Sequence, residues 1–178
     1  MQIPGNGELP GRLETERLLL LRPTREDIGP LSQLWRDEQT QRFLGGVRTP
    51  EHAKETAAGV LQSWELYGVG MWVVWTRSRC ERIGLCGLGL FEGEPELAYK
   101  YFPQFWGHGY ATEAARTCVA CAFDVLQLER LVGVTQEANL ASQHVLEKIG
   151  MHHVRDLWKW DAPQRYYELS RARFLSPL

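Results

Sequence analysis

The sequence has no long apolar run. Its first apolar stretch, Leu18 to Leu21, covers only four residues, whereas a membrane-spanning helix needs about 20. The N-terminus also lacks a charged region followed by an apolar one, so we expect no secretory signal and a cytoplasmic location. Charge of one sign is equally scarce, because 20 Lys and Arg against 22 Asp and Glu leave a formal net charge of -2. This balance gives no electrostatic reason to expect a nucleic acid or a membrane as a partner.

Cysteine is sparse too, with four in 178 residues. Cys118 and Cys121 have C-x-x-C spacing, but no second pair of Cys or His residues stands at ligand spacing. Both fall on the apolar face of a predicted helix, where a thiol behaves as a small apolar side chain. We therefore predict core thiols, with neither a disulfide framework nor a metal site.

Two common phosphate-binding motifs are missing, namely Gly-Lys-Ser/Thr at Walker spacing and Gly-x-Gly-x-x-Gly. In their place stands Trp-Gly-His-Gly-Tyr-Ala-Thr-Glu-Ala, residues 106–114, between an apolar and aromatic run at 97–102 and a helical apolar pattern. The first turn of a helix leaves about four backbone N–H groups unpaired and carries partial positive charge. Gly107 and Gly109 have no Cβ to keep an anion away from those groups. The stretch predicts an anion-binding turn, although a tight turn without a ligand would use the same glycines.

This stretch resembles the coenzyme A loop of the GNAT N-acetyltransferase superfamily, and within it the branch that acetylates the N-terminal alanine or serine of ribosomal proteins. Two further strings resemble that branch: residues 13–27 (Leu-Glu-Thr-Glu-Arg-Leu through Arg-Pro to Asp) and 139–151 (Asn-x-x-Ser through Glu-Lys-Ile-Gly-Met). The family's loop reads Arg/Gln-x-x-Gly-x-Gly/Ala, which fits from Gln104 or from Trp106. We take the second register because it aligns the whole Gly-Tyr-Ala-Thr-Glu-Ala string.

The expected fold is α+β, with a flexible lead-in at residues 1–12 and a single GNAT-like domain at 13–178. A chain of this length suits one domain, and its 44% apolar content is ordinary for a globular protein. The resemblance implies a mixed, mostly antiparallel sheet of about seven strands flanked by about four helices. Residue patterns place the strands at 17–22, 71–76, 82–91, 94–102, 130–135, 154–160 and 166–173.

The resemblance also implies acetyl-CoA as co-substrate. It would lie along the backbone of the fourth strand, in the glycine loop, and at the start of the helix capped by Asn139. The residues expected to bind it are Tyr99, Lys100, Tyr101, Trp106, Gly107, His108, Gly109, Tyr110, Ala111, Thr112, Asn139 and Ser142. Asn139 would serve equally well as a plain helix N-cap, and the two roles are compatible.

Acetyl transfer to an amine needs a group that removes a proton and a group that stabilises or protonates the departing thiolate. Glu96 is the candidate base, because Glu96-Leu97-Ala98-Tyr99 matches the family's Glu-hydrophobic-Gly-Tyr motif with Ala in place of Gly. Glu94 or water alone are the alternatives. Ser142 matches the position proposed in this branch to protonate the thiolate, although a serine in the first turn of a helix is otherwise a routine surface residue. Glu113 is expected to complement the helix dipole.

These inferences predict an N-acetyltransferase that acts on a primary amine, with a protein N-terminal α-amine as the first choice. An α-amine has a pKa near 7.7–8.0 and loses its proton far more readily than lysine, whose pKa is near 10.4. The alternatives are acetylation of a small amine (a polyamine, an amino acid or an aminoglycoside) and a non-catalytic acyl-CoA-binding sensor. Relatives often form homodimers, but no residue here requires one. Acceptor specificity is expected in the two early helices and in the loop at 158–165.

Overall fold

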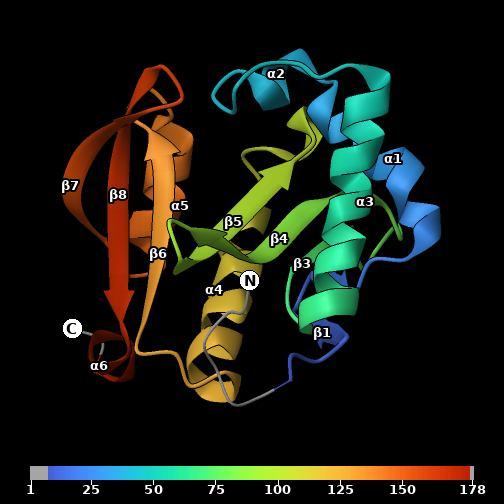
Figure 1. The fold of residues 1–178 in the computed structure, drawn as a ribbon. Coiled ribbons are helices and arrows are strands. Elements are labelled where there is room, and N and C mark those ends of the chain that lie inside the picture. Colours follow the sequence, from blue (N-terminus) through green and yellow to red (C-terminus); the bar gives the residue numbers. More distant parts are fainter. Residues whose placement is uncertain (1–7, 177–178) are drawn as a thin grey trace.

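An eight-stranded sheet forms the centre of the computed structural model, which describes residues 8–176 (Figure 1). The strand order is β1-β2-β3-β4-β5-β6-β8-β7. The strands are β1 (Arg12–Glu14), β2 (Leu18–Leu21), β3 (Met71–Thr76), β4 (Arg82–Phe91), β5 (Glu94–Tyr101), β6 (Arg130–Gln136), β7 (His152–Lys159) and β8 (Ala162–Ser170). All neighbours pair antiparallel except β5 and β6, which are parallel. The predicted mixed, mostly antiparallel sheet is confirmed, with one strand more than expected.

Six α-helices accompany the sheet in the described part of the chain. They are α1 (Ile28–Ser32), α2 (Glu38–Gln41), α3 (Pro50–Tyr67), α4 (Tyr110–Ala120), α5 (Leu140–Lys148) and α6 (Arg171–Leu175). Three 3-10 turns, η1 (Arg25–Asp27), η2 (Gln33–Trp35) and η3 (Pro103–Phe105), and the π-helical turn η4 (Cys121–Val125) complete them. The sequence predicted about four helices. The short α2 and α6 were missed because four or five residues are too few to show helical periodicity.

The expected boundary at residue 12 needs a correction. Leu9 is buried at 3% exposure, and the carbonyl oxygen of Pro10 accepts a hydrogen bond from the indole N–H of Trp72 at 3.0 Å. The proline and glycine content suggested a loose segment, but an apolar side chain and an acceptor for a buried indole tie residues 9–12 to the domain. Residues 1–7 of the expected lead-in lie outside the described residues.

The helices pack on the two faces of the sheet. On one face α4 carries Ala114, Ala115, Cys118 and Val119 into the larger apolar core, in which Cys118 Sγ lies 3.5 Å from Cys86 Sγ. On the other face α1, η2 and α3 cover β3 and β4 through Leu31, Leu34, Trp35, Ala53 and Ala57. Within residues 8–176 no group of three or more His, Cys, Asp or Glu could hold a metal ion. No helix in that range is long and apolar enough to cross a lipid bilayer.

The join between β5 and β6 is the feature that positions the site. Only one residue pair, Glu96 with Val132, is in register between these two strands. Beyond that pair the strands diverge, as the directions of the β5 and β6 arrows show in Figure 1. The sheet is therefore open between β5 and β6 from Leu97 onward.

Candidate active site

The open join exposes backbone groups of β5. The Phe102 N–H donates to the Ile83 carbonyl at 3.0 Å, and the register pairs Lys100 with Leu85, so residues 98, 100 and 102 bond toward β4. Successive residues of a strand point their backbone groups to opposite sides, so those of Tyr99 and Tyr101 face the gap. The Tyr101 carbonyl is taken by the indole N–H of Trp106 at 2.9 Å. Of the three predicted β5 contacts, Tyr99 and Tyr101 have backbone groups on the gap side, whereas those of Lys100 face β4.

The predicted glycine loop lies at the start of α4. Gly107 and Gly109 have φ angles of +78° and +79°, a left-handed conformation that favours glycine. Gly109 is the N-cap residue, and no side chain caps the helix. The N–H groups of Tyr110, Ala111 and Thr112 open the helix, and the space beside Gly107 is free within 4 Å of an added Cβ. Uncapped first-turn amides next to open space are a suitable cradle for the pyrophosphate of a coenzyme.

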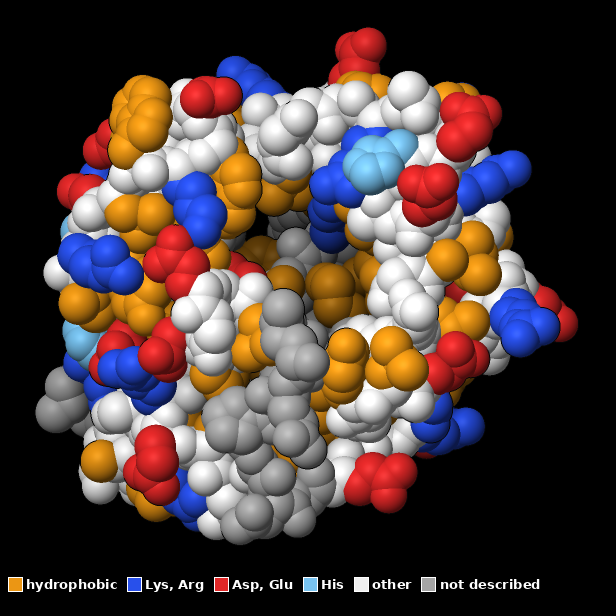
Figure 2. Space-filling model, viewed as in Figure 1, with side chains coloured by type: hydrophobic (Ala, Val, Ile, Leu, Met, Phe, Trp, Pro, Cys, Tyr) orange, Lys and Arg blue, Asp and Glu red, His pale blue; other side chains and the backbone are white. Residues whose placement is uncertain are grey.

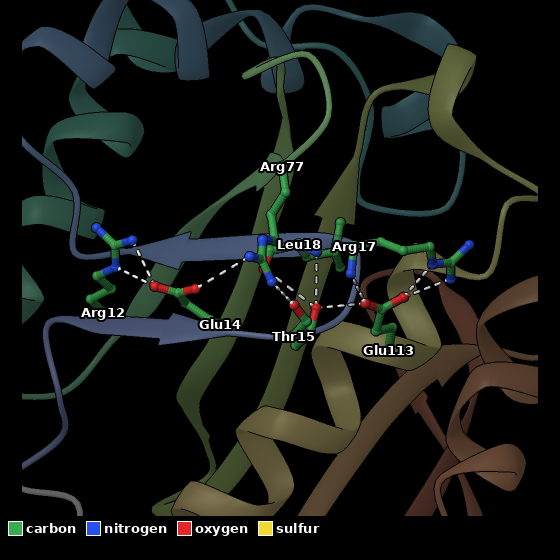
Figure 3. A network of polar contacts seen from close by, with 7 residues as sticks. All are labelled: Arg12, Glu14, Thr15, Arg17, Leu18, Arg77 and Glu113. Atoms are coloured by element: carbon green, nitrogen blue, oxygen red, sulfur yellow. Dashed lines mark hydrogen bonds and ion pairs between the residues drawn. The ribbon is translucent and has the colours of Figure 1, made fainter.

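Arg17 supplies a positive charge that our sequence interpretation did not assign to the site. Its guanidinium donates to the His108 carbonyl at 2.9 Å, forms an ion pair with Glu113 at 2.6 Å, and lies 4.9 Å from the centre of the Tyr110 ring. Figure 3 shows how this side chain and Thr15, both from the β1–β2 turn, converge on Glu113 in the first turn of α4. Arg17 belongs to the string 13–27 that resembled the family, and this resemblance was the only available signal.

Glu113 does more than complement the helix dipole. It accepts hydrogen bonds from Thr15 Oγ1, from the Arg17 backbone N–H and from the Arg17 guanidinium. Burial opposes its ionisation, but the hydrogen bonds from Thr15 and Arg17 outweigh that penalty and lower the pKa of Glu113. The carboxylate therefore joins the β1–β2 turn to the glycine loop.

In the glycine loop, His108 contacts both aromatic residues, Trp106 and Tyr110. The His108 ring stacks on Tyr110 with 5.6 Å between centroids and 12° between planes. His108 Nδ1 lies 2.8 Å from the Trp106 carbonyl, so Nδ1 carries the hydrogen and Nε2 is left for an outside partner. Trp106 is itself 48% exposed while its indole N–H is bonded to Tyr101.

The two candidate carboxylates have opposite environments. Glu94 is paired with Arg130 at 2.6 Å, and the hydrogen bond from Arg130 lowers the pKa of Glu94. Glu96 is half-buried at the point where β5 and β6 separate. Desolvation raises the pKa of Glu96 to about 7, against the opposing effect of a hydrogen bond from the Val134 N–H. Of the two, only Glu96 has a pKa suited to proton exchange near neutral pH.

Ser142 is joined to Tyr99 across the gap. The Tyr99 hydroxyl donates to the Ser142 carbonyl at 3.0 Å, and the two hydroxyl oxygens lie 2.9 Å apart. Burial raises the pKa of Tyr99, so its hydroxyl stays protonated. Asn139 caps α5 by accepting a hydrogen bond from the Ser142 N–H at 3.2 Å, which leaves its side-chain amide available.

The face of the sheet that carries Glu96 is hollow. Antiparallel pairing places Gly89 opposite Glu96, so the residue beside the carboxylate is small, whereas Gly87, opposite Ala98, is covered by the backbone of Gly70 and Met71. A Cβ added at Gly89 would meet nothing within 4 Å. Figure 2 shows the hollow on this face, between the part of the molecule formed by β6–β8 and the part formed by α1–α3.

Comparison with known proteins agrees with this geometry. Residues 17–152 match the family described as acetyltransferase (GNAT) domain, and the protein therefore belongs to that family. It is 29% identical to YkkB of Bacillus subtilis over 88% of this chain and 94% of that protein. It is 27% identical to the B. subtilis protein named "Putative ribosomal N-acetyltransferase YdaF", over 63% of this chain and 66% of that one.

Solved structures share the fold. An acetyltransferase from Agrobacterium tumefaciens superposes with a TM-score of 0.78 at 25% identity, over 91% of this chain and 95% of that chain. An aminoglycoside acetyltransferase in complex with coenzyme A superposes with a TM-score of 0.74 at 18% identity, over 90% and 98% of the two chains, and shows likeness of fold alone. The protein is thus an N-acetyltransferase of the GNAT family, whose members take the acetyl group from acetyl-CoA.

Proposed function

We propose that this protein acetylates the α-amine at the N-terminus of a polypeptide, with Glu96 as general base. The observation that carries the proposal is the half-buried Glu96 carboxylate, whose pKa of about 7 lies close to that of an α-amine. A base with this pKa can take the proton of an α-ammonium with little free-energy cost, whereas a lysine ammonium is a far poorer donor. The likeness to YdaF and the three matched strings support a peptide acceptor.

Acetyl-CoA is proposed to lie between the glycine loop and the gap of the sheet. The amides of Tyr110, Ala111 and Thr112 would hold its pyrophosphate with help from Arg17, and the gap-side backbone groups of Tyr99 and Tyr101 would hold its pantetheine arm. Trp106, Gly107, His108 and Gly109 would shape the loop, and the side-chain amide of Asn139 would donate a hydrogen bond to the same co-substrate. This arrangement would bring the thioester to the open floor beside Glu96, where the acceptor amine would attack.

We propose that Ser142 protonates the departing thiolate. The Tyr99 hydroxyl keeps its proton and lies 2.9 Å from Ser142 Oγ, so it can position the serine hydroxyl by hydrogen bonding. In this scheme Glu96 removes a proton from the acceptor amine, and Ser142 donates a proton to the departing thiolate. We place the reaction in the cytoplasm, since the cysteine content suits a reducing compartment.

Glu96→Gln tests the proposal. Turnover with a peptide beginning in Ala or Ser should fall tenfold or more at pH 7 and recover partly at higher pH, where the α-amine deprotonates by itself. The measurement is release of free thiol across a pH series, with Glu94→Gln as the matched control and Ser142→Ala as a variant that should lower turnover without the recovery at high pH. A pH profile for Glu96→Gln that superimposes on the parent profile would remove Glu96 from the mechanism.

A second acceptor class, a small amine, has the support of the fold shared with an aminoglycoside acetyltransferase. The same assay with a polyamine and an aminoglycoside distinguishes it. Tight coenzyme binding without thiol release from any amine would instead indicate a non-catalytic sensor.

A further inference from the structure

A basic cluster lies on the hollow face of the sheet and forms no ion pair with an acidic side chain of residues 8–176. Lys100 of β5 shares the face of Glu96, because residues 96, 98 and 100 alternate with the residues that pack on α4. Its Nζ stands 4.5 Å from the centre of the Trp35 ring in η2. Figure 2 shows Lys and Arg side chains, with a His beside them, on the α3 side of the hollow.

Arg48, in the segment before α3, is the second member of the cluster. Its Nη1 donates to Thr56 Oγ1 at 2.6 Å and lies 3.3 Å from His52 Nε2. The other guanidinium nitrogens make no side-chain hydrogen bond within residues 8–176. Glu55, an exposed residue, lies 3.4 Å from the other ring nitrogen of His52, Nδ1.

A charged Lys100 side chain is energetically unfavourable at this half-buried position unless an anion compensates its charge. Among the described residues no carboxylate lies within 4.0 Å of Lys100 or of Arg48. Burial, and then the charge of Arg48, lower the pKa of Lys100 to about 7. The face of Trp35 attracts the ammonium only weakly, whereas an anion would offset both unfavourable effects.

We propose that Lys100 and Arg48 bind a carboxylate of the acceptor, so that the preferred acceptor is an acidic peptide N-terminus. The inference rests on the proposed function, since it takes the acceptor amine to lie at Glu96. Lys100 is a specificity residue in this scheme and takes no part in proton transfer. The same two cations would repel polyamines and aminoglycosides, which carry several positive charges.

The strand sets the distance between the two subsites. Glu96 and Lys100 are four residue steps apart in β5, which is about 13 Å along a strand. After allowance for the two side chains, the amine and the anion of the acceptor should lie about 10 Å apart, or roughly three extended residues. A free α-amino acid is too short to reach both subsites. A peptide with Asp or Glu at its third and fourth positions spans them.

The test compares three peptides that differ only at positions three and four: Ala-Ser-Asp-Glu, Ala-Ser-Asn-Gln and Ala-Ser-Lys-Lys, each followed by the same neutral tail. We expect kcat/KM to be about tenfold higher for the acidic peptide than for the neutral one, and lowest for the basic one. Lys100→Met keeps the apolar stem and should reduce the acidic preference to about twofold, mainly through KM. Lys100→Arg should restore it. Arg173→Met on α6 removes the same charge elsewhere and should leave the preference unchanged.

Coenzyme affinity and thermal unfolding of Lys100→Met establish that the variant is folded and that its coenzyme site is intact. The proposal is overturned if the parent prefers the neutral or the basic peptide, if Lys100→Met keeps the acidic preference, or if it lowers kcat/KM equally for all three peptides.

Two non-peptide acceptors distinguish a failure of this inference from a failure of the proposed function. If the parent acetylates no peptide, the proposed function fails, and aminooctanoate is then compared with diaminooctane. These two acceptors have an amine and a second group at about the required separation, and they differ in the charge of that group. Preference for aminooctanoate that is lost in Lys100→Met supports the anion subsite, and preference for diaminooctane overturns it.

Discussion

Burial moves Glu96 and Lys100 toward the same pKa from opposite directions. Each is a half-buried residue on the open face of β5, and desolvation is the largest cause of both shifts. Desolvation disfavours whichever form is charged, so it raises the pKa of the acid and lowers that of the base, to about 7 in each case. Two groups at the middle of their titration near neutral pH are typical of a functional site and unfavourable for stability.

The stability cost of Glu96 can be measured. Its folded-state pKa of about 7 is above the ordinary glutamate value of 4.5, so its contribution to stability is fully present below pH 4.5 and is lost as the pH rises through 7. Glu96→Gln removes this loss and should raise the free energy of unfolding at pH 8 by up to about 3 kcal/mol. Urea unfolding at pH 8 and pH 4 measures the effect, which should shrink toward zero at pH 4. Glu94→Gln, at an exposed and ion-paired residue, should give no such gain, and an equal gain for Glu96→Gln at both pH values would contradict the prediction.

At the scale of the element, the glycine loop and α4 act together. Gly109 begins the helix in a left-handed conformation, and its carbonyl accepts the Glu113 N–H at 3.1 Å, the first bond of the helix. The backbone amides that follow Gly109 are therefore oriented by the helix, and they stay accessible because glycine has no side chain. The same helix buries its other side in the core through Ala114 and Cys118, which holds the loop in place.

Gly109→Val should weaken acetyl-CoA binding at least tenfold, because a β-branched residue is strained at a φ of +79° and would stand before the first-turn amides. Gly93→Val is a control with a similar backbone: Gly93 has a φ of +88° but lies in the β4–β5 turn, where an added Cβ meets nothing within 4 Å, whereas at Gly109 it would lie 3.5 Å from the Arg17 guanidinium. Both variants should lose stability by about 1–3 kcal/mol, and calorimetry should show weaker coenzyme binding in the first alone. Near-normal affinity in folded Gly109→Val would refute the assignment of the loop.

At the scale of the whole molecule, the β1–β2 turn is fastened to α4 by one carboxylate. Glu113 and Arg17 lie 96 residues apart in the chain, and Thr15 and Arg77 extend the network toward the β3–β4 turn (Figure 3). Arg17 also donates a hydrogen bond to the His108 carbonyl, so the β1–β2 turn at the edge of the sheet is bonded directly to the glycine loop.

Glu113→Gln should lower stability at neutral pH and flatten its acid dependence. The pKa of Glu113 is depressed in the folded state, so the carboxylate contributes stability above the ordinary glutamate pKa of 4.5, and this contribution is lost as the pH falls through the folded-state pKa. Thermal unfolding of parent and variant between pH 7 and pH 3 measures the difference, with Glu147→Gln on α5 as a control. Parallel curves for the parent and Glu113→Gln would show that the carboxylate makes no such contribution.

The sequence by itself determined the family and most of the elements. Strands β3 and β4 lie at the predicted residues, and helix α5 begins after the predicted cap Asn139, because caps, glycine turns and apolar periodicity act over a few neighbouring residues. The glycine turn before α4 was predicted for the same reason: its two left-handed glycines and its helix start are adjacent in the chain.

Only the tertiary structure decided which of those residues face each other and in what environment. The separation of β5 from β6 after Glu96 depends on where the covering helices and β8 hold the two strands, and it is this separation that opens the backbone of Tyr99 and Tyr101. The pKa of Glu94 differs from that of Glu96 because Glu94 is bonded to Arg130, which is 36 residues further along the chain. The environment of Lys100 is set by Trp35 and Arg48, which are also distant in the sequence. Proton affinity depends on burial and on nearby charge, and residues distant in the sequence supply both.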